Sequence, residues 1–134
     1  RIEMLFNGKN SSTPAENTIN GSISIWADGV SVMASWSGDK KNIPLYLCGN
    51  TENCDTNNIE IFSSSLPVKN IDFYQNRENV IIISSGKRID TIEMTGSAGR
   101  EIRTIYSGEN PIFYKNGDQS IYIKDGQDIF ELKF

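Results

Sequence analysis

Carboxylates are the side chains of this sequence that come closest to offering a catalytic chemistry. A glycosidase needs two of them facing one cleft, roughly 5 to 10 Å apart. The aspartates here stand in predicted turns rich in Gly and Asn, where short acidic side chains hydrogen-bond the local backbone. We interpret them as turn residues and predict no catalytic residue among them. They are Asp28, Asp39, Asp118, Asp125 and Asp128.

The sequence contains no histidine, which is the commonest metal ligand and the side chain whose unperturbed pKa lies nearest neutrality. A Ser-His-Asp triad is therefore excluded, and neither a phosphate-binding loop nor a zinc spacing occurs. Asp125, Gly126 and Asp128 could offer oxygens to calcium, but the spacing of an EF-hand is missing. We predict no metal and no cofactor, and we keep a carboxylate-based glycan hydrolase or lyase as the alternative to a non-catalytic protein.

The two cysteines, Cys48 and Cys54, lie six positions apart in a polar, turn-rich stretch where the chain can double back. We predict that they form a disulfide, with two free thiols in a reducing compartment as the alternative. In the chain-entropy description, closing so short a loop stabilises the fold by roughly 2 to 2.5 kcal/mol. A disulfide in turn predicts an extracellular or cell-surface location.

Aromatic residues could form a ligand platform, because rings give a large contact area at little cost in entropy. The Phe-Tyr pair at 73 and 74 recurs at 113 and 114, which favours a packing role with the Phe inward and the Tyr hydroxyl bonded. Trp26 differs because it stands beside an Asp-Gly turn signal at 28 and 29. We therefore predict Trp26 and Asp28 as ligand-binding residues. Trp36, Tyr46 and Tyr122 are the other aromatic residues that could belong to such a platform.

An internal repeat without gaps places residues 72–94 over residues 112–134, at an offset of forty. Each copy alternates apolar and polar residues with a period of two, interrupted where Gly or Asn permits a tight turn. Val80 to Ile83 is apolar at every position, as expected of a strand covered on both faces. The pattern of each unit indicates the strands of a four-stranded blade. The sequence therefore predicts an all-β fold that forms part of a β-propeller.

The predicted blades divide the single domain of residues 1–134. The first spans 20–66, with strands at 22–25, 29–36, 43–48 and 59–62; the second spans 67–108; the third spans 109–134 and lacks its fourth strand. The polar segment 10–20 is expected to be a surface loop. Residues 2–10 match 102–110 in pattern, so residues 1–8 are expected to supply the missing outer strand.

The number of blades is small for a ring, because propellers typically have four to eight. Two hypotheses follow from a count of three. Two copies could associate head to tail into a six-bladed ring, or further blades could belong to a longer parent chain. Within one ring, closure would remove the sheet edges that otherwise pair with other chains.

Several short segments resemble the β-propeller region of bacterial PEGA-domain-associated, membrane-anchored surface proteins with TolB-like repeats. The resemblance covers roughly residues 20–134 and implies an extracytoplasmic location, with a tether outside this chain. It identifies no site residue. The segments are Ile43-Pro-Leu-Tyr-Leu-Cys48 with Cys54, Ile71-Asp-Phe-Tyr74, Tyr106-Ser-Gly-Glu-Asn-Pro111 and Ile121-Tyr-Ile-Lys-Asp-Gly126.

Composition narrows the function further. The net charge of −4 and the absence of a basic cluster argue against nucleic acid as a partner. The longest apolar runs are a few residues, far below the roughly 20 needed to span a bilayer as a helix. We therefore predict a non-catalytic module that engages a protein or glycan through loops at one end of the propeller. A structural subunit of a surface assembly is the further alternative.

Overall fold

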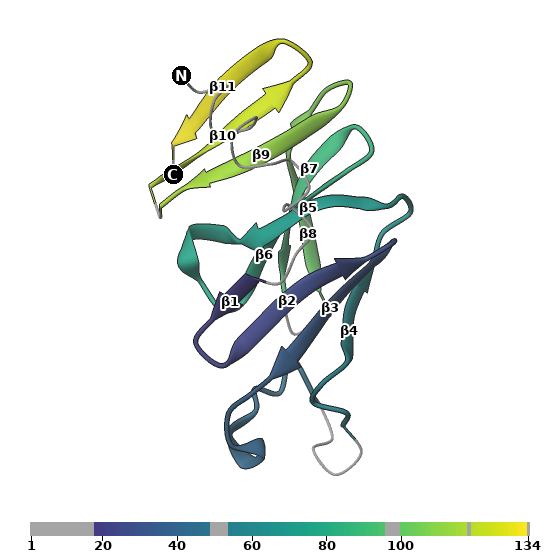
Figure 1. Ribbon diagram of the computed structural model, residues 1–134, viewed down its shortest axis with the longest axis vertical. Coiled ribbons are helices and arrows are strands. Elements are labelled where there is room, and N and C mark those ends of the chain that lie inside the picture. The colour runs from purple at the N-terminus through teal and green to yellow at the C-terminus, as the bar shows by residue number, and fades with distance from the viewer. Residues whose placement is uncertain (1–17, 49–53, 96–99, 118, 134) are drawn as a thin grey trace.

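The protein is all-β and forms three antiparallel sheets (Figure 1). A computed structural model describes residues 18–48, 54–95, 100–117 and 119–133. Sheet 1 contains β1 (Thr18–Asn20), β2 (Ile23–Asp28), β3 (Ser31–Trp36) and β4 (Ile59–Ser63). Sheet 2 contains β5 (Val68–Phe73), β6 (Val80–Ser85), β7 (Arg88–Glu93) and β8 (Glu101–Ser107). Sheet 3 contains β9 (Pro111–Asn116), β10 (Ser120–Asp125) and β11 (Asp128–Lys133).

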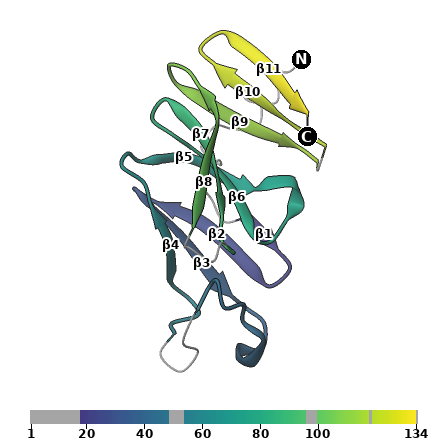
Figure 2. The ribbon, with the colours of Figure 1, turned by 180° about the vertical axis from the view of Figure 1, so that it is seen from behind.

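The sheets lie one after another, with sheet 2 between the other two in both views (Figures 1 and 2). One apolar cluster joins sheets 1 and 2 and a second joins sheets 2 and 3. Strand β6 contributes to both, because Ile81 and Ile83 belong to the first cluster and Ile82 to the second. All three side chains are at most 1% exposed. The prediction that this strand is covered on both faces is confirmed.

A hairpin of the same shape recurs in every sheet, formed by β2–β3, β6–β7 and β10–β11. Each pairs two six-residue strands across a two-residue turn. The first turn residue is glycine each time, with φ of 61° at Gly29, 59° at Gly86 and 63° at Gly126. A side chain is strained at such angles, so glycine is what the tight turn requires. The repeat at an offset of forty therefore corresponds to strands β6–β7 and β10–β11.

The expected strand at residues 43–48 is wrong. This segment is a turn in which the carbonyl of Pro44 accepts from the N–H groups of Leu47 and Cys48, at 3.0 and 3.2 Å. Leu47 and Cys48 are buried while Leu45 is 79% exposed, so the spacing is not that of a strand. Pro44 has no N–H to donate to a sheet, which favours this turn.

The start of sheet 1 also differs from the prediction. Thr18–Asn20 belongs to the segment expected to be a surface loop, and this expectation is wrong for these three residues. They form strand β1, which pairs antiparallel with β2. Sheet 1 therefore keeps four strands although 43–48 is not one of them. The proposed outer strand at residues 1–8 lies outside the described residues, and so does Asp118. The described residues alone do not form a closed ring of sheets. In this described part, no helix has the length and apolar character to cross a membrane.

The three sheets share two ends, which we name for what connects the strands there. The turn end carries the β2–β3, β6–β7 and β10–β11 turns together with the links from sheet to sheet, at the right and upper side of Figure 1. The loop end carries the β5–β6 connection and the long β3–β4 connection, which hangs below sheet 1 in the same view.

Candidate functional site

A polar pocket of about 130 Å³ opens at the loop end of sheet 2. It is lined by the end of β7, the start of β8 and the β5–β6 connection. Its walls carry two arginines, two glutamates and a tyrosine, with Val80 as the apolar component. The lining residues are Tyr74, Arg77, Val80, Thr91, Glu93, Glu101 and Arg103.

The pairing of β7 with β8 fixes the positions of three charged residues that line the pocket. Glu93 of β7 stands opposite Glu101 of β8, and Thr91 stands opposite Arg103. Like charges directly opposite on neighbouring strands repel, and Arg103 offsets this repulsion because its guanidinium lies 3.8 Å from the Glu101 carboxylate. The side chains of Arg103 and Glu101 are 76% and 64% exposed. Such an exposed ion pair is weak, so both groups can turn toward a ligand.

Tyr74 enters the pocket from a short 3₁₀ turn, Tyr74–Asn76, that follows β5. The turn is closed by Arg77, whose backbone N–H donates to the carbonyl of Tyr74 at 3.1 Å. Gln75 adopts φ of 57°, a left-handed angle, two residues before Arg77, which also lines the pocket. Partial burial raises the pKa of the Tyr74 hydroxyl, which therefore stays protonated and able to donate at neutral pH.

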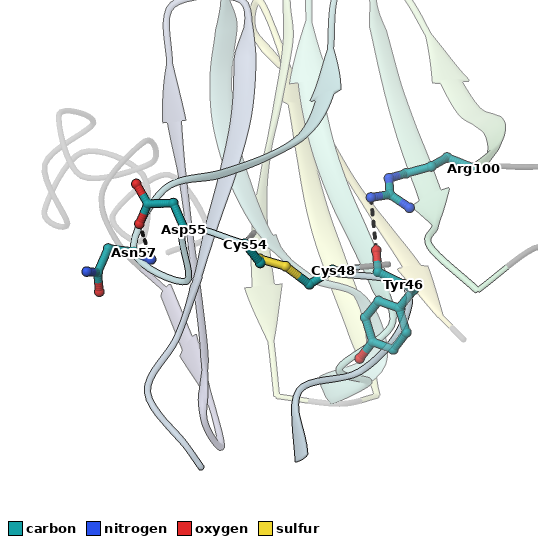
Figure 3. Close-up of a disulfide and its surroundings, with 6 residues drawn as sticks. All are labelled: Tyr46, Cys48, Cys54, Asp55, Asn57 and Arg100. Atoms are coloured by element: carbon teal, nitrogen blue, oxygen red, sulfur yellow. Dashed lines mark hydrogen bonds between the residues drawn. A yellow bond between two sulfur atoms is a disulfide. The ribbon is translucent and has the colours of Figure 1, made fainter. Parts of the chain in front are cut away.

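A disulfide joins Cys48 and Cys54 in the β3–β4 connection, which belongs to the same loop end (Figure 3). Cys48 and Cys54 are bonded, with their Cα atoms 6.0 Å apart, inside the usual range for a disulfide. The predicted pairing is thus present. Cys48 is buried and packs on the cluster between sheets 1 and 2. The bond therefore joins two parts of the long β3–β4 connection, and the packing of both cysteines attaches that connection to the core.

Arg100 joins the turn at residues 43–48 to sheets 1 and 2. Its guanidinium donates to three carbonyls, those of Ile61 at 2.7 Å, Tyr46 at 3.0 Å and Met94 at 3.3 Å. Figure 3 shows the bond to Tyr46 beside the disulfide. Burial lowers the pKa of Arg100 from its usual value, but three aligned carbonyl dipoles favour the charged form.

One electrostatic interaction links Tyr46 to the connection that lines the pocket. Burial, and after it the negative charge of Glu78, raises the pKa of Tyr46. Glu78 belongs to the β5–β6 connection that also carries Tyr74 and Arg77. Tyr46, two residues before Cys48, thus lies within electrostatic reach of the connection that lines the pocket.

The turn end has a polar junction between sheets 2 and 3. Lys69 donates to the carbonyl of Gly86 and to the side chain of Asn110, both at 2.8 Å. Asp125 accepts from the hydroxyl of Tyr106 at 2.7 Å and from the N–H of Asn110 at 2.9 Å. Burial lowers the pKa of Lys69, and nearby Asp125 partly opposes this. Every polar group named here has a partner inside the protein, which is typical of a structural junction.

The residues predicted from sequence to bind a ligand are Trp26 and Asp28, and neither lines the pocket. Both lie on the face of β2 that points away from sheet 2, with Trp26 half-buried and Asp28 exposed at the turn end. Asp39 caps the short helix Lys40–Asn42 by accepting from the N–H of Lys41 at 3.2 Å, as a turn residue should. Asp125 was expected to bond its own local backbone, and this is wrong. Its partners are Tyr106 and Asn110, which lie 19 and 15 residues away in the sequence.

Sequence reasoning missed the charged residues of the pocket. Glu93, Glu101 and Arg103 stand in ordinary strands, and only the pairing of β7 with β8 brings them together. The one signal in the sequence was the alternation of Glu101 and Arg103, which places both side chains on one face of a strand.

Comparison of the chain with protein-family models, with curated proteins and with solved structures found no match. The class of the protein is therefore the one that its own structure defines, an all-β protein of three stacked antiparallel sheets.

Proposed function

We propose that this chain is a non-catalytic binding or scaffolding module of the cell exterior that engages a glycan or protein through its loop end. The observation that supports this is the polar pocket at Tyr74. Its guanidinium, carboxylate and hydroxyl groups offer planar hydrogen-bonding partners, and the tyrosine ring offers a stacking surface. This combination suits a sugar ring or a charged peptide side chain.

The size of the pocket limits what it can hold. A volume of about 130 Å³ matches roughly four water molecules, at about 30 Å³ each. One edge of a sugar ring or the end of one partner side chain would therefore enter, with the rest of the ligand spread over the loop end. The Cys48–Cys54 bond and the hydrogen bond from Arg100 to Tyr46 favour this, because groups that are already held in place lose little entropy on binding.

We further propose that the three sheets are blades of a β-propeller and that residues 1–8 supply the outer strand beside β11. The support is the repeat, since β11 corresponds to β7 and β7 pairs with β8, whose sequence residues 2–10 resemble. The disulfide and the resemblance to tethered bacterial surface proteins favour a location at the cell surface.

Binding to an array of neutral and acidic glycans, together with capture of surface proteins, tests the proposed site. The double variant Arg77→Ala/Arg103→Ala should bind at least tenfold more weakly than the wild type, since each lost charged hydrogen bond contributes about 1.5 to 3 kcal/mol. Lys87→Ala, which removes an exposed cation at the turn end, serves as the matched control. Loss of binding in Trp26→Ala/Asp28→Ala alone would move the site to sheet 1. A wild type that binds nothing would contradict the proposal.

A glycan hydrolase or lyase is the second candidate, and one observation favours it. Glu93 and Glu101 line the same pocket from neighbouring strands, and paired carboxylates are what such chemistry uses. Release of new reducing ends from a glycan by the wild type, abolished in Glu93→Gln and in Glu101→Gln, would establish the enzyme. Binding without any turnover would establish the module.

A further inference from the structure

Sheets 1 and 3 each have one face that no other described sheet covers. Because the hairpin repeats in every sheet, each of these outer faces has a corresponding face in another sheet that is buried inside the stack. Corresponding positions of the three hairpins can be compared, because the strands have equal lengths and the same turn. We call forward the face that a sheet turns toward the next sheet along the chain, and backward the opposite face. Two forward positions can be followed through sheets 1, 2 and 3. The first is occupied by Ile25, Ile82 and Tyr122, in that order. The second is occupied by Val32, Ile89 and Ile129.

Forward positions are fully buried wherever a following sheet covers them. In sheets 1 and 2 all four side chains at these positions are 0% exposed. In sheet 3, which is the last of the described layers (Figures 1 and 2), Tyr122 and Ile129 are only half-buried. Ile112 of β9 lies on the same face, in line with Ile129 through Lys124. The forward face of sheet 3 thus keeps the apolar character of an interface.

Backward positions follow the same rule at the other end of the stack. Ile83 and Ile123 are backward residues, and they are 1% and 2% exposed because a preceding sheet covers them. The corresponding residue of sheet 1 is Trp26, which is half-buried. Met33 pairs with Trp26 across the hairpin, and Ile19, on the same face, is 69% exposed. Trp26, Met33 and Ile19 thus place apolar side chains on this face although no described sheet precedes it.

We propose that the forward face of sheet 3 packs on the backward face of sheet 1 in a second copy of this chain, and that two copies close a ring of six blades. The proposal deepens the propeller arrangement proposed above and rests on it. Apolar side chains would meet on both sides, with Tyr122 and Ile129 facing Trp26 and Met33.

Geometry and charge both favour a second copy as the occupant. The two faces differ from each other, so contact between copies is head to tail and needs a rotation that closes. Three sheets per chain give six blades in two copies, within the range of known rings. The forward face of sheet 3 carries Lys124 and Lys133 with one acid, Glu131, while the strands of sheet 1 place Asp28 and Glu60 on its backward face. Opposite charge steers such faces together.

The mass of the full chain in solution, measured by light scattering over a range of concentrations, tests the proposal. The wild type should reach twice the 15.0 kDa of one chain. Tyr122→Glu and Trp26→Glu should each weaken self-association at least about thirtyfold, the effect of removing a residue that dominates an interface. Leu45→Glu, an identical change at a 79% exposed apolar residue away from both faces, should leave the mass unchanged.

Mixing the two defective variants gives the sharpest result. Tyr122→Glu retains an intact sheet 1 face and Trp26→Glu an intact sheet 3 face, so the mixture should form dimers that neither variant forms alone. Circular dichroism shows whether each variant is folded. A monomeric wild type would overturn the proposal, as would masses beyond the dimer or dissociation caused by only one variant. Ligand binding is measured separately, so a dimer without a ligand leaves this inference standing, and a binding monomer leaves the pocket standing.

Discussion

The hydroxyl of Tyr106 donates to the carboxylate of Asp125 at 2.7 Å, across the boundary between sheets 2 and 3. The same carboxylate accepts from the backbone N–H groups of Asn110 at 2.9 Å and Glu109 at 3.2 Å. Asp125 therefore ties the link between β8 and β9 to the β10–β11 hairpin. It holds sheet 3 in position relative to sheet 2.

Replacing Asp125 with Asn should lower the melting temperature most at neutral pH. The hydrogen bond from Asn110, and then those from Tyr106 and Glu109, hold the pKa of Asp125 below its usual value. A depressed carboxyl pKa stabilises the fold fully above its unfolded value of about 3.9, and this stabilisation is lost as pH falls through the folded pKa. The difference between wild type and Asp125→Asn should therefore narrow below about pH 4 in thermal melts.

Asp128→Asn is the matched control, because Asp128 is an exposed carboxylate that faces Asp125 across the same turn. It should melt within about 2 °C of the wild type at pH 7, as most exposed substitutions do. A similar loss in both variants would mean that general charge, and not the bonds of Asp125, stabilises the turn end.

Arg100→Met should reduce the free energy of unfolding by about 1 to 3 kcal/mol, measured by urea denaturation. The change removes the donors to the carbonyls of Ile61, Tyr46 and Met94, and a buried acceptor without a donor is costly. Arg100→Lys should lie between the two, because one ammonium cannot span three separate carbonyls as a planar guanidinium does. Equal stability of the Lys and Met variants would contradict this role.

Removing the disulfide should destabilise the fold by about 2 kcal/mol, the value expected for so short a loop. The double variant Cys48→Ser/Cys54→Ser and the reduced wild type should agree approximately in urea denaturation. Reductant should lower the stability of the wild type and leave the double variant unchanged. If reductant has no effect on the wild type, the Cys48–Cys54 bond does not form in solution.

Sequence predicted the hairpins of sheets 2 and 3 well because their determinants are local. Alternation sets the two faces of β6 and β10, and Gly86 and Gly126 set the turns between the strands. Strand β1 and the turn at Pro44 were assigned wrongly for the opposite reason. Thr18–Asn20 is too short to show alternation, and its strand forms by pairing with β2. The segment 43–48 has the apolar residues typical of a strand, but its backbone forms a turn.

The candidate site was less predictable than the fold, because long-range pairing assembles it. Glu93 and Glu101 meet only through the register of β7 with β8. Arg100 reaches the carbonyl of Tyr46 across a separation of 54 residues. By contrast, the Cys48–Cys54 bond was predictable, since six positions in a turn-rich segment bring the two side chains together without help from the rest of the fold.

The register of the proposed outer strand beside β11 can be derived from sheet 2. Asp90 of β7 pairs with Thr104 of β8. Phe130 corresponds to Asp90 in the repeat, and Met4 corresponds to Thr104. We therefore predict that Met4 lies opposite Phe130, with their Cα atoms about 4.5 to 5.5 Å apart, as directly opposed residues of antiparallel strands are.

Met4→Cys with Phe130→Cys should form a disulfide under mild oxidation, since such a spacing lies within disulfide range. Peptide mapping identifies the bond, and a non-reducing gel shows whether it joins one chain or two. Either product supports the pairing, and the gel decides which copy supplies the strand. Glu3→Cys with Phe130→Cys is the matched control, because neighbouring strand residues point to opposite faces and this pair should cross-link far more slowly. Equal rates for the two pairs would contradict the register, and no bond in either would contradict an outer strand at this edge.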